Sequence, residues 1–169
     1  MTVPEEFGSL AGLTLTYVGD GNNMAHSLLL GCALVGVNVR IASPAEYQPD
    51  AAVVDRARQI ARDQSEVVIT TDPQAAAKGA HVLYTDVWAS MGQEELAQTR
   101  IPIFKPYQIN EELLTVAERN AIVLHCLPAH RGEEISEAAL EGAQSRVWDE
   151  AENRLHAQKA LLACVLGAS

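Results

Sequence analysis

Short apolar runs alternate with longer amphipathic segments along the chain, and this alternation predicts strands separated by helices. Five runs have the length and β-branched content of buried strands. They lie at 13–18, 38–42, 66–70, 81–85 and 121–125. Helices are predicted from about 23 to 35, 51 to 63 and 151 to 166, with a short helix after Asp72-Pro73.

The predicted strands are almost continuously apolar, which is typical of a parallel sheet covered by helices on both faces. Right-handed crossovers then give an α/β, Rossmann-like, doubly wound three-layer domain with a central, mainly parallel five-stranded sheet. Ligands of such sheets bind beyond the carboxyl ends of the strands. The segments 19–24, 86–92 and 126–132 follow strands there, so we expect the functional residues among them.

Composition narrows the range of functions. The 169 residues fit one domain, and the 22 acidic and 12 basic side chains give a formal net charge of -10. This charge disfavours nucleic acid and anionic membranes as partners, and no apolar run approaches the roughly 20 residues needed to span a bilayer. The three cysteines are widely spaced, which indicates neither a disulfide framework nor a zinc site and points to a reducing cytoplasm.

The segment G-D-G-N-N-M at 19–24 follows a strand and opens a helix, where a dinucleotide fingerprint would lie. Met24 occupies the third glycine position, and Asp20 places a negative charge where a pyrophosphate would bind. The second predicted strand also ends without an acidic residue for a ribose hydroxyl. A nucleotide-binding function and a tight turn without ligand therefore remain as weaker alternatives.

A small polar ligand fits these segments better. Asn22 and Asn23 stand at a helix N-terminus, where free N–H groups favour a carboxylate, although asparagine is also a common N-cap. Asp86 ends a strand and could hold an ammonium group, with Ser90 as a further hydrogen-bonding residue. Alternatively, Asp86 or Ser90 caps the next helix, and Trp88 packs in the core.

The H-C-L-P segment at 125–128 ends the fifth predicted strand. Cys126 stands beside a histidine that could polarise its thiol, although a lone cysteine is more often a small core residue. Pro128 restricts Leu127 to non-helical conformations, which leaves the Leu127 carbonyl free to face the cleft.

Two charged stretches follow. The loop at 130–134 is interpreted as solvated surface, and the spacing of its single histidine indicates no metal site. Glu150 and Glu152 suit the first turn of the last predicted helix. Arg154 does not suit that turn, so an anionic or carbonyl partner is expected for it.

In combination, these motifs resemble the transcarbamylases, and within them the ornithine carbamoyltransferases. The resemblance runs from about residue 7 to 166 and rests on G-D-G-N-N at 19–23, D-V-W-A-S-M-G at 86–92, H-C-L-P-A at 125–129 and E-A-E-N-R at 150–154. The S-M-G and H-C-L-P signatures favour ornithine as the amine substrate. The resemblance implies transfer of the carbamoyl group from carbamoyl phosphate to L-ornithine, giving L-citrulline and phosphate in arginine biosynthesis, without metal or organic cofactor.

The resemblance also implies roles for residues. Asn23, Ser90 and Met91 would hold the α-amino and α-carboxylate groups of ornithine. Asp86 and Cys126 would flank its δ-amine. The remaining contacts, to the carbamoyl group, would come from the backbone of Cys126 and Leu127 and from the side chain of Arg154, which would stabilise charge on the carbonyl oxygen.

One departure from the family is large. Family enzymes are about twice this length and hold phosphate with an S-T-R-T-R loop and an H-P-x-Q segment, and neither motif occurs here. We therefore expect residues 1–169 to form the second, ornithine-binding domain, inactive without the carbamoyl-phosphate-binding first domain. The full-length family is trimeric through that first domain, so a monomer or weak dimer is expected here. A stand-alone amino-acid-binding module is the alternative.

Overall fold

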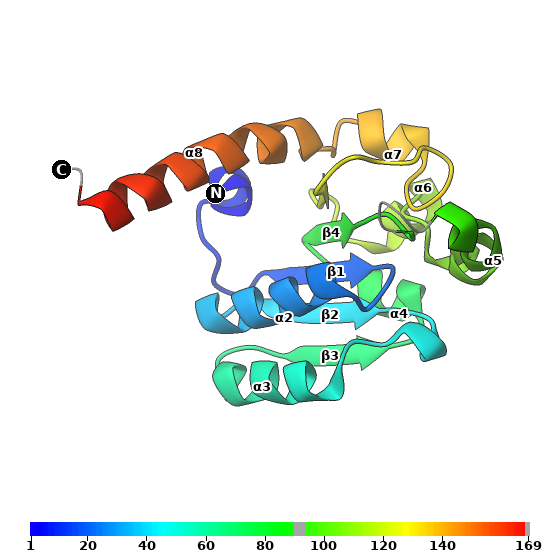
Figure 1. Cartoon of the computed structure of the whole chain (residues 1–169), viewed down its shortest axis with the longest axis horizontal. Helices are drawn as coiled ribbons and strands as arrows, with labels where there is room; N and C mark the ends of the chain where they lie inside the picture. Colours follow the sequence, from blue (N-terminus) through cyan, green and yellow to red (C-terminus); the bar gives the residue numbers. More distant parts are fainter. Residues whose placement is uncertain (90–93, 168–169) are drawn as a thin grey trace.

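The computed structural model describes residues 1–89 and 94–167. Its centre is a five-stranded sheet with the strand order β3-β2-β1-β4-β5, in which every neighbouring pair is parallel (Figure 1). The strands are β1 (Thr14–Val18), β2 (Asn38–Ala42), β3 (Val67–Thr70), β4 (Val82–Thr85) and β5 (Ile122–His125). The structure thus confirms the doubly wound α/β prediction and all five predicted strands.

Eight α-helices and two short 3-10 helices are present in the described residues. The α-helices are α1 (Thr2–Phe7), α2 (Asn23–Val35), α3 (Ala51–Ala61), α4 (Pro73–Ala77), α5 (Glu94–Phe104), α6 (Glu111–Val116), α7 (Glu137–Glu141) and α8 (Val147–Leu166). The 3-10 helices are η1 (Ala45–Tyr47) and η2 (Lys105–Tyr107).

The sheet is buried on both faces, as its apolar strands require. One core joins the strands to α2 and α3 through residues such as Leu29, Ile41 and Val54. The other core lies on the opposite face, where Leu83 contributes from the sheet and Leu140 from α7. Together the helices and the sheet form three layers, and in Figure 1 helices α2 and α3 lie in front of the sheet and α4 behind it.

The helices differ from the sequence prediction in two respects. Helices α1, α6 and α7 were not predicted, because they are short, whereas the helix that the capping alternative places after Ser90 is present as α5, which contains Pro102. Helix α8 begins at Val147, four residues before the predicted start, and its N-cap residue Arg146 makes no side-chain capping hydrogen bond. The sequence therefore offered no capping signal at the true start.

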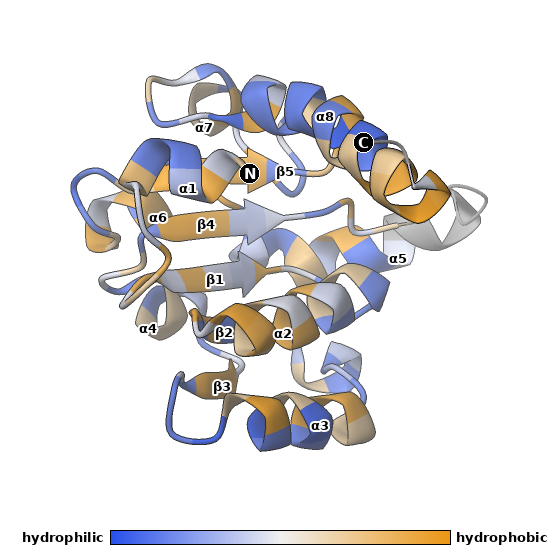
Figure 2. Ribbon diagram, turned by 90° about the vertical axis from the view of Figure 1, so that its left-hand side faces the viewer, coloured by the Kyte–Doolittle hydropathy of each residue, from blue (hydrophilic) through white to orange (hydrophobic). Residues whose placement is uncertain are grey.

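The C-terminal half of α8 is exposed and apolar. Leu161, Leu162, Val165 and Leu166 are each at least 60% exposed, and Figure 2 shows these last turns in the colours of hydrophobic residues. An uncovered apolar helix face of this kind is typical of a surface that contacts another segment or protein. Within the described residues, no helix combines the length and apolar character required to cross a membrane.

The turn after β1 depends on a close backbone approach at Gly21. A Cβ atom on this residue would lie 2.3 Å from the Pro49 backbone nitrogen and 2.5 Å from the Tyr47 carbonyl oxygen. Any side chain would displace the segment around η1, so the second glycine of G-D-G-N-N is accounted for by packing.

Candidate functional site

The polar site lies at the topological switch point of the sheet. Strand β1 stands between β2 and β4, and the chain leaves it towards β2 and β3 before returning to β4 and β5 on its other side. The segments after β1, β4 and β5 therefore meet at one edge, as the sequence predicted.

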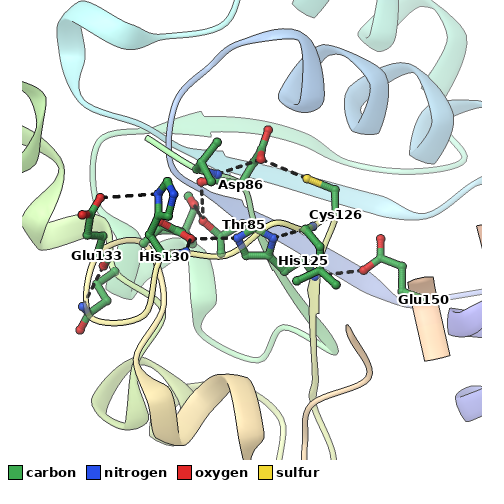
Figure 3. Close-up of polar contacts among 12 residues, drawn as sticks. Thr85, Asp86, His125, Cys126, His130, Glu133 and Glu150 are labelled. Atoms are coloured by element: carbon green, nitrogen blue, oxygen red, sulfur yellow. Dashed lines mark hydrogen bonds and ion pairs between the residues drawn. The ribbon is translucent and has the colours of Figure 1, made fainter. Parts of the chain in front are cut away.

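At this edge, Asp86 and Cys126 form a direct contact. The Cys126 thiol donates a hydrogen bond to Asp86 Oδ1 at 3.0 Å, and the Val87 N–H donates to the same oxygen at 2.8 Å (Figure 3). Both side chains are partly buried. Both donors share Oδ1, and Oδ2 accepts no hydrogen bond from the described residues, so Oδ2 is the oxygen that could take a ligand ammonium group.

The prediction that a histidine polarises the Cys126 thiol is wrong. The His125 ring is buried and bonds to Leu127 and Glu134, whereas the group that faces the thiol is a carboxylate. Burial first, then the hydrogen bond to Asp86 and its charge, raise the pKa of Cys126 above its usual value. The thiol is therefore a neutral hydrogen-bond donor, not a nucleophile.

Glu150 connects α8 to the sheet. Its Oε1 accepts a hydrogen bond from the Tyr84 hydroxyl at 2.6 Å. Its Oε2 accepts one from the His125 N–H at 3.0 Å, which Figure 3 shows. Burial raises the pKa of this carboxyl. The sequence pattern explains Glu150 by the helix dipole alone and does not indicate its contacts with β4 and β5.

Arg154 is exposed in the third turn of α8, because the helix begins at Val147. The dipole argument for a partner in the first turn is therefore wrong, and no ion pair to Arg154 occurs among the described residues. Arg154 instead lines two adjoining hollows of about 580 Å³ each, and Cys126 lines both as well. An exposed guanidinium without an ion pair among the described residues thus lines the same hollows as Cys126.

The two asparagines at the start of α2 have separate roles. The Asn22 side chain caps the helix by accepting from the Met24 N–H at 3.0 Å. Asn23 is exposed, and its side chain has no hydrogen-bond partner in the described part of the chain. Asn23 is therefore the asparagine that can donate to a ligand. Ser90 and Met91 lie outside the described residues.

Leu127 lies at the rim of the second hollow, beside Pro128 and Arg154. Its φ is +54°, so it avoids the right-handed helical region as predicted, but it adopts the left-handed region and not the extended one. The Leu127–Pro128 peptide bond is cis.

Trp88 is a core residue, in agreement with the packing alternative. It is 2% exposed and stacks on Phe104, with ring centroids 5.9 Å apart. Nearby, Arg100 of α5 forms an ion pair with Asp20 and lies over the Tyr47 ring, 4.7 Å from its centroid. This pair joins residues 80 positions apart, and the sequence analysis did not identify it.

The charged loop after β5 is not all solvated surface. Arg131 is exposed and pairs with Glu137 and Glu141, but Glu134 is fully buried, which corrects its interpretation as a surface residue. His130, Glu133 and Glu134 form the candidate cation-binding group in the described part of the chain, with ligand atoms within 4.8 Å of one another. Two of the three are at least partly exposed, and such acidic groups are common without an ion.

Comparison with known proteins places this α/β domain in a class of transferases. The family model described as "Aspartate/ornithine carbamoyltransferase, Asp/Orn binding domain" matches residues 11–165. The chain belongs to this family.

Similar proteins and structures agree with the family assignment. The chain is 70% identical to the ornithine carbamoyltransferase of Nostoc punctiforme over 168 residues, which are 99% of this chain and 55% of that protein. The crystal structure of the Gloeobacter violaceus ornithine carbamoyltransferase aligns with a TM-score of 0.88 and 59% identity, over 96% of this chain and 54% of that one. The Pyrococcus furiosus enzyme aligns with a TM-score of 0.94 and 47% identity, over 99% and 54%. The chain thus spans about half the length of the relatives it matches.

Proposed function

We propose that this chain forms the ornithine-binding side of a carbamoyl-transfer site and acts together with a segment that binds carbamoyl phosphate. The observation that carries the proposal is the Asp86–Cys126 pair at the switch point of an Asp/Orn binding domain. The family's relatives are ornithine carbamoyltransferases of about twice this length, so the other half of such a protein is the natural source of the second segment.

The reaction requires a neutral δ-amine on ornithine. The amine nitrogen attacks the carbonyl carbon of carbamoyl phosphate, a C–N bond forms, the C–O bond to phosphate breaks, and the proton that the nitrogen then loses goes to the departing phosphate. In this proposal Asp86 Oδ2 holds the δ-ammonium group and accepts a proton from it. The Cys126 thiol, held protonated, keeps the carboxylate oriented through Oδ1.

The α-substituents of ornithine would bind at the start of α2. The exposed Asn23 amide and the N-terminus of this 13-residue helix favour a carboxylate. The resemblance assigns Ser90 and the Met91 backbone to the same end of the ligand. This arrangement would place the δ-amine towards Asp86.

The carbamoyl group would bind towards Arg154 and Leu127. A free guanidinium beside the Cys126 hollow can stabilise the negative charge that develops on the carbonyl oxygen. The exposed apolar half of α8, with Leu161 and Leu166 among its residues, supports a second segment that covers this helix. Without that segment the site stays open to water, and transfer should not occur.

The function in the cell follows from the same proposal. Ornithine and carbamoyl phosphate are the substrates, citrulline is the product, and arginine biosynthesis is the process. The free cysteines Cys32, Cys126 and Cys164 fit the reducing cytoplasm. Since this half would lack the family's trimer contacts, a monomer or weak dimer is expected, and sedimentation showing a stable trimer would refute that.

Titration calorimetry with ornithine tests the binding step. We expect binding weaker than micromolar for the wild-type chain, because half of the cleft is absent, and no measurable binding for Asp86→Asn. Asp63→Asn removes one exposed acidic charge elsewhere and is the matched control. Equal binding by Asp86→Asn and the wild type would contradict the proposal. Strong binding would favour a stand-alone amino-acid binder, and stabilisation by NAD without any ornithine effect would favour a nucleotide binder.

A further inference from the structure

The His125 side chain, fully buried beneath the site, has both ring nitrogens engaged. Its Nδ1 lies 2.9 Å from the Leu127 backbone nitrogen, and its Nε2 lies 3.1 Å from Glu134 Oε1. A backbone N–H can only donate, so Nδ1 must be the unprotonated acceptor. Nε2 then carries the proton and donates it to the Glu134 carboxylate, which fixes one neutral tautomer.

The Glu134 carboxylate joins two ends of the loop after β5. Its Oε1 accepts from the His125 ring and also from the His130 N–H at 2.5 Å. Its own backbone is anchored, because the Ile109 N–H donates to the Glu134 carbonyl at 2.9 Å. A fully buried carboxylate is costly to desolvate. The hydrogen bonds that it accepts from the described residues come from His125 and His130, at the start of this loop and within it.

The hydrogen bonds from Glu134 to His125 and from His125 to Leu127 hold the Leu127 backbone in place. With a φ of +54° in a non-glycine residue, its backbone needs external hydrogen bonds to stay in the left-handed region. The bond from its N–H to His125 Nδ1 supplies one of them. Leu127 and Cys126 both line the hollow that Arg154 borders, so the position of this backbone sets the shape of that hollow.

We propose that Glu134 is a positioning residue, which fixes the His125 tautomer and through it the Leu127 backbone at the carbamoyl end of the site. The catalytic part of this inference rests on the proposed function, whereas the structural part concerns this chain alone. Its requirement is a hydrogen-bond acceptor at position 134, not a negative charge. Glutamine should therefore replace Glu134, and leucine should not.

Nuclear magnetic resonance of the ¹⁵N-labelled chain tests the structural part. The wild type should show His125 protonated at Nε2 and not at Nδ1, and Glu134→Gln should retain this tautomer. In Glu134→Leu the Nε2–H loses its acceptor, so the Nε2-protonated tautomer should be less populated, and the Leu127 amide should exchange with solvent about tenfold faster, as expected for one weakened hydrogen bond. Amides of β1 and β2 should be unchanged.

Glu133→Leu is the matched control, because Glu133 is the neighbouring acid and contacts the exposed His130 ring, not His125. It should leave the tautomer and the Leu127 exchange rate as in the wild type. A wild-type His125 protonated at Nδ1 overturns the proposal, even if Glu134→Leu does not fold. An unchanged tautomer and exchange rate in folded Glu134→Leu overturn it as well.

Citrulline assays with the complementary half supplied test the catalytic part. Glu134→Leu should lower kcat by at least about tenfold while KM for ornithine stays within about twofold, because none of the affected hydrogen bonds involves Asp86. Glu134→Gln should restore most of kcat. A raised KM with unchanged kcat would contradict a role at the carbamoyl end. If the wild-type tautomer is as described but no citrulline forms, the proposed function fails while the positioning of Leu127 stands.

Discussion

Cys126 Sγ lies 3.0 Å from Asp86 Oδ1, and this hydrogen bond connects the ends of β4 and β5. The carboxylate both orients the thiol and keeps it protonated, because burial and the adjacent negative charge raise the pKa of Cys126. The cysteine therefore serves the site as a neutral donor.

Alkylation rates should reflect this arrangement. At pH 8, iodoacetamide should modify the exposed Cys164 first, while Cys126 reacts slowly. Asp86→Asn removes the charge that raises the pKa of Cys126, and each unit by which that pKa falls gives about tenfold more thiolate. We expect Cys126 to react at least about tenfold faster in Asp86→Asn, as measured by mass spectrometry of tryptic peptides. Equal rates in wild type, Asp86→Asn and the Asp63→Asn control would contradict the assignment.

Glu150 should make stability depend on pH in a defined direction. Burial raises its pKa above the usual 4.5, so the folded chain holds this proton more tightly than the unfolded chain does. The stability that this bound proton contributes to the folded chain is fully present below pH 4.5 and is lost as the pH rises through the raised pKa of Glu150. Glu150→Gln stays neutral and can still accept from the His125 N–H, so its free energy of unfolding should improve relative to wild type as the pH rises.

Urea unfolding at several pH values measures this difference, and a difference that does not change with pH would contradict it. Glu150→Ala provides the contrast. It leaves the Tyr84 hydroxyl and the His125 N–H without their acceptor, which should lower the free energy of unfolding by about 1–3 kcal/mol relative to Glu150→Gln.

The partly buried location of the Asp20–Arg100 ion pair should make it a stabilising contact between the turn after β1 and α5. Their side chains are 17% and 13% exposed, and Arg100 also contacts the rings of Tyr47 and Phe104. A double-mutant cycle with Asp20→Asn and Arg100→Met should give a coupling energy of about 1–3 kcal/mol.

The exposed Asp55–Arg58 pair is the internal control. Its side chains are 70% and 54% exposed, so the same cycle there should give less than about 1 kcal/mol. Similar coupling energies for the two pairs would show that burial does not strengthen the Asp20–Arg100 contact.

The sequence predicted the sheet and the edge that carries the site, because apolar strands and polar strand ends leave a local pattern. Asp86 and Cys126 were identified in this way. Glu134 and Glu150 were misinterpreted, since an acidic residue that is buried by a distant strand or loop looks like a surface residue in the sequence. The Asp20–Arg100 pair joins segments 80 positions apart, and no local pattern signals such a contact.

The start of a helix could likewise be predicted only where a local capping residue marks it. Asn22 caps α2 with its side chain, and the predicted start of that helix was correct. Helix α8 lacks a capping side chain at Arg146, and its start was placed four residues late. The position of Arg154 in the helix was therefore wrong, and its contact with the carbamoyl group stays a prediction, although Arg154 lines the same hollows as Cys126.

The most direct test of the account is citrulline formation by this chain mixed with the complementary half of the Nostoc punctiforme relative, the part that this chain does not match. We expect no citrulline from either part alone and measurable citrulline from the mixture. Asp86→Asn in the mixture should lower the rate at least about 100-fold, and Asp63→Asn should not. Citrulline formation by this chain alone, at a rate near that of an intact relative, would contradict the account, as would an inactive mixture whose two parts are folded and associated.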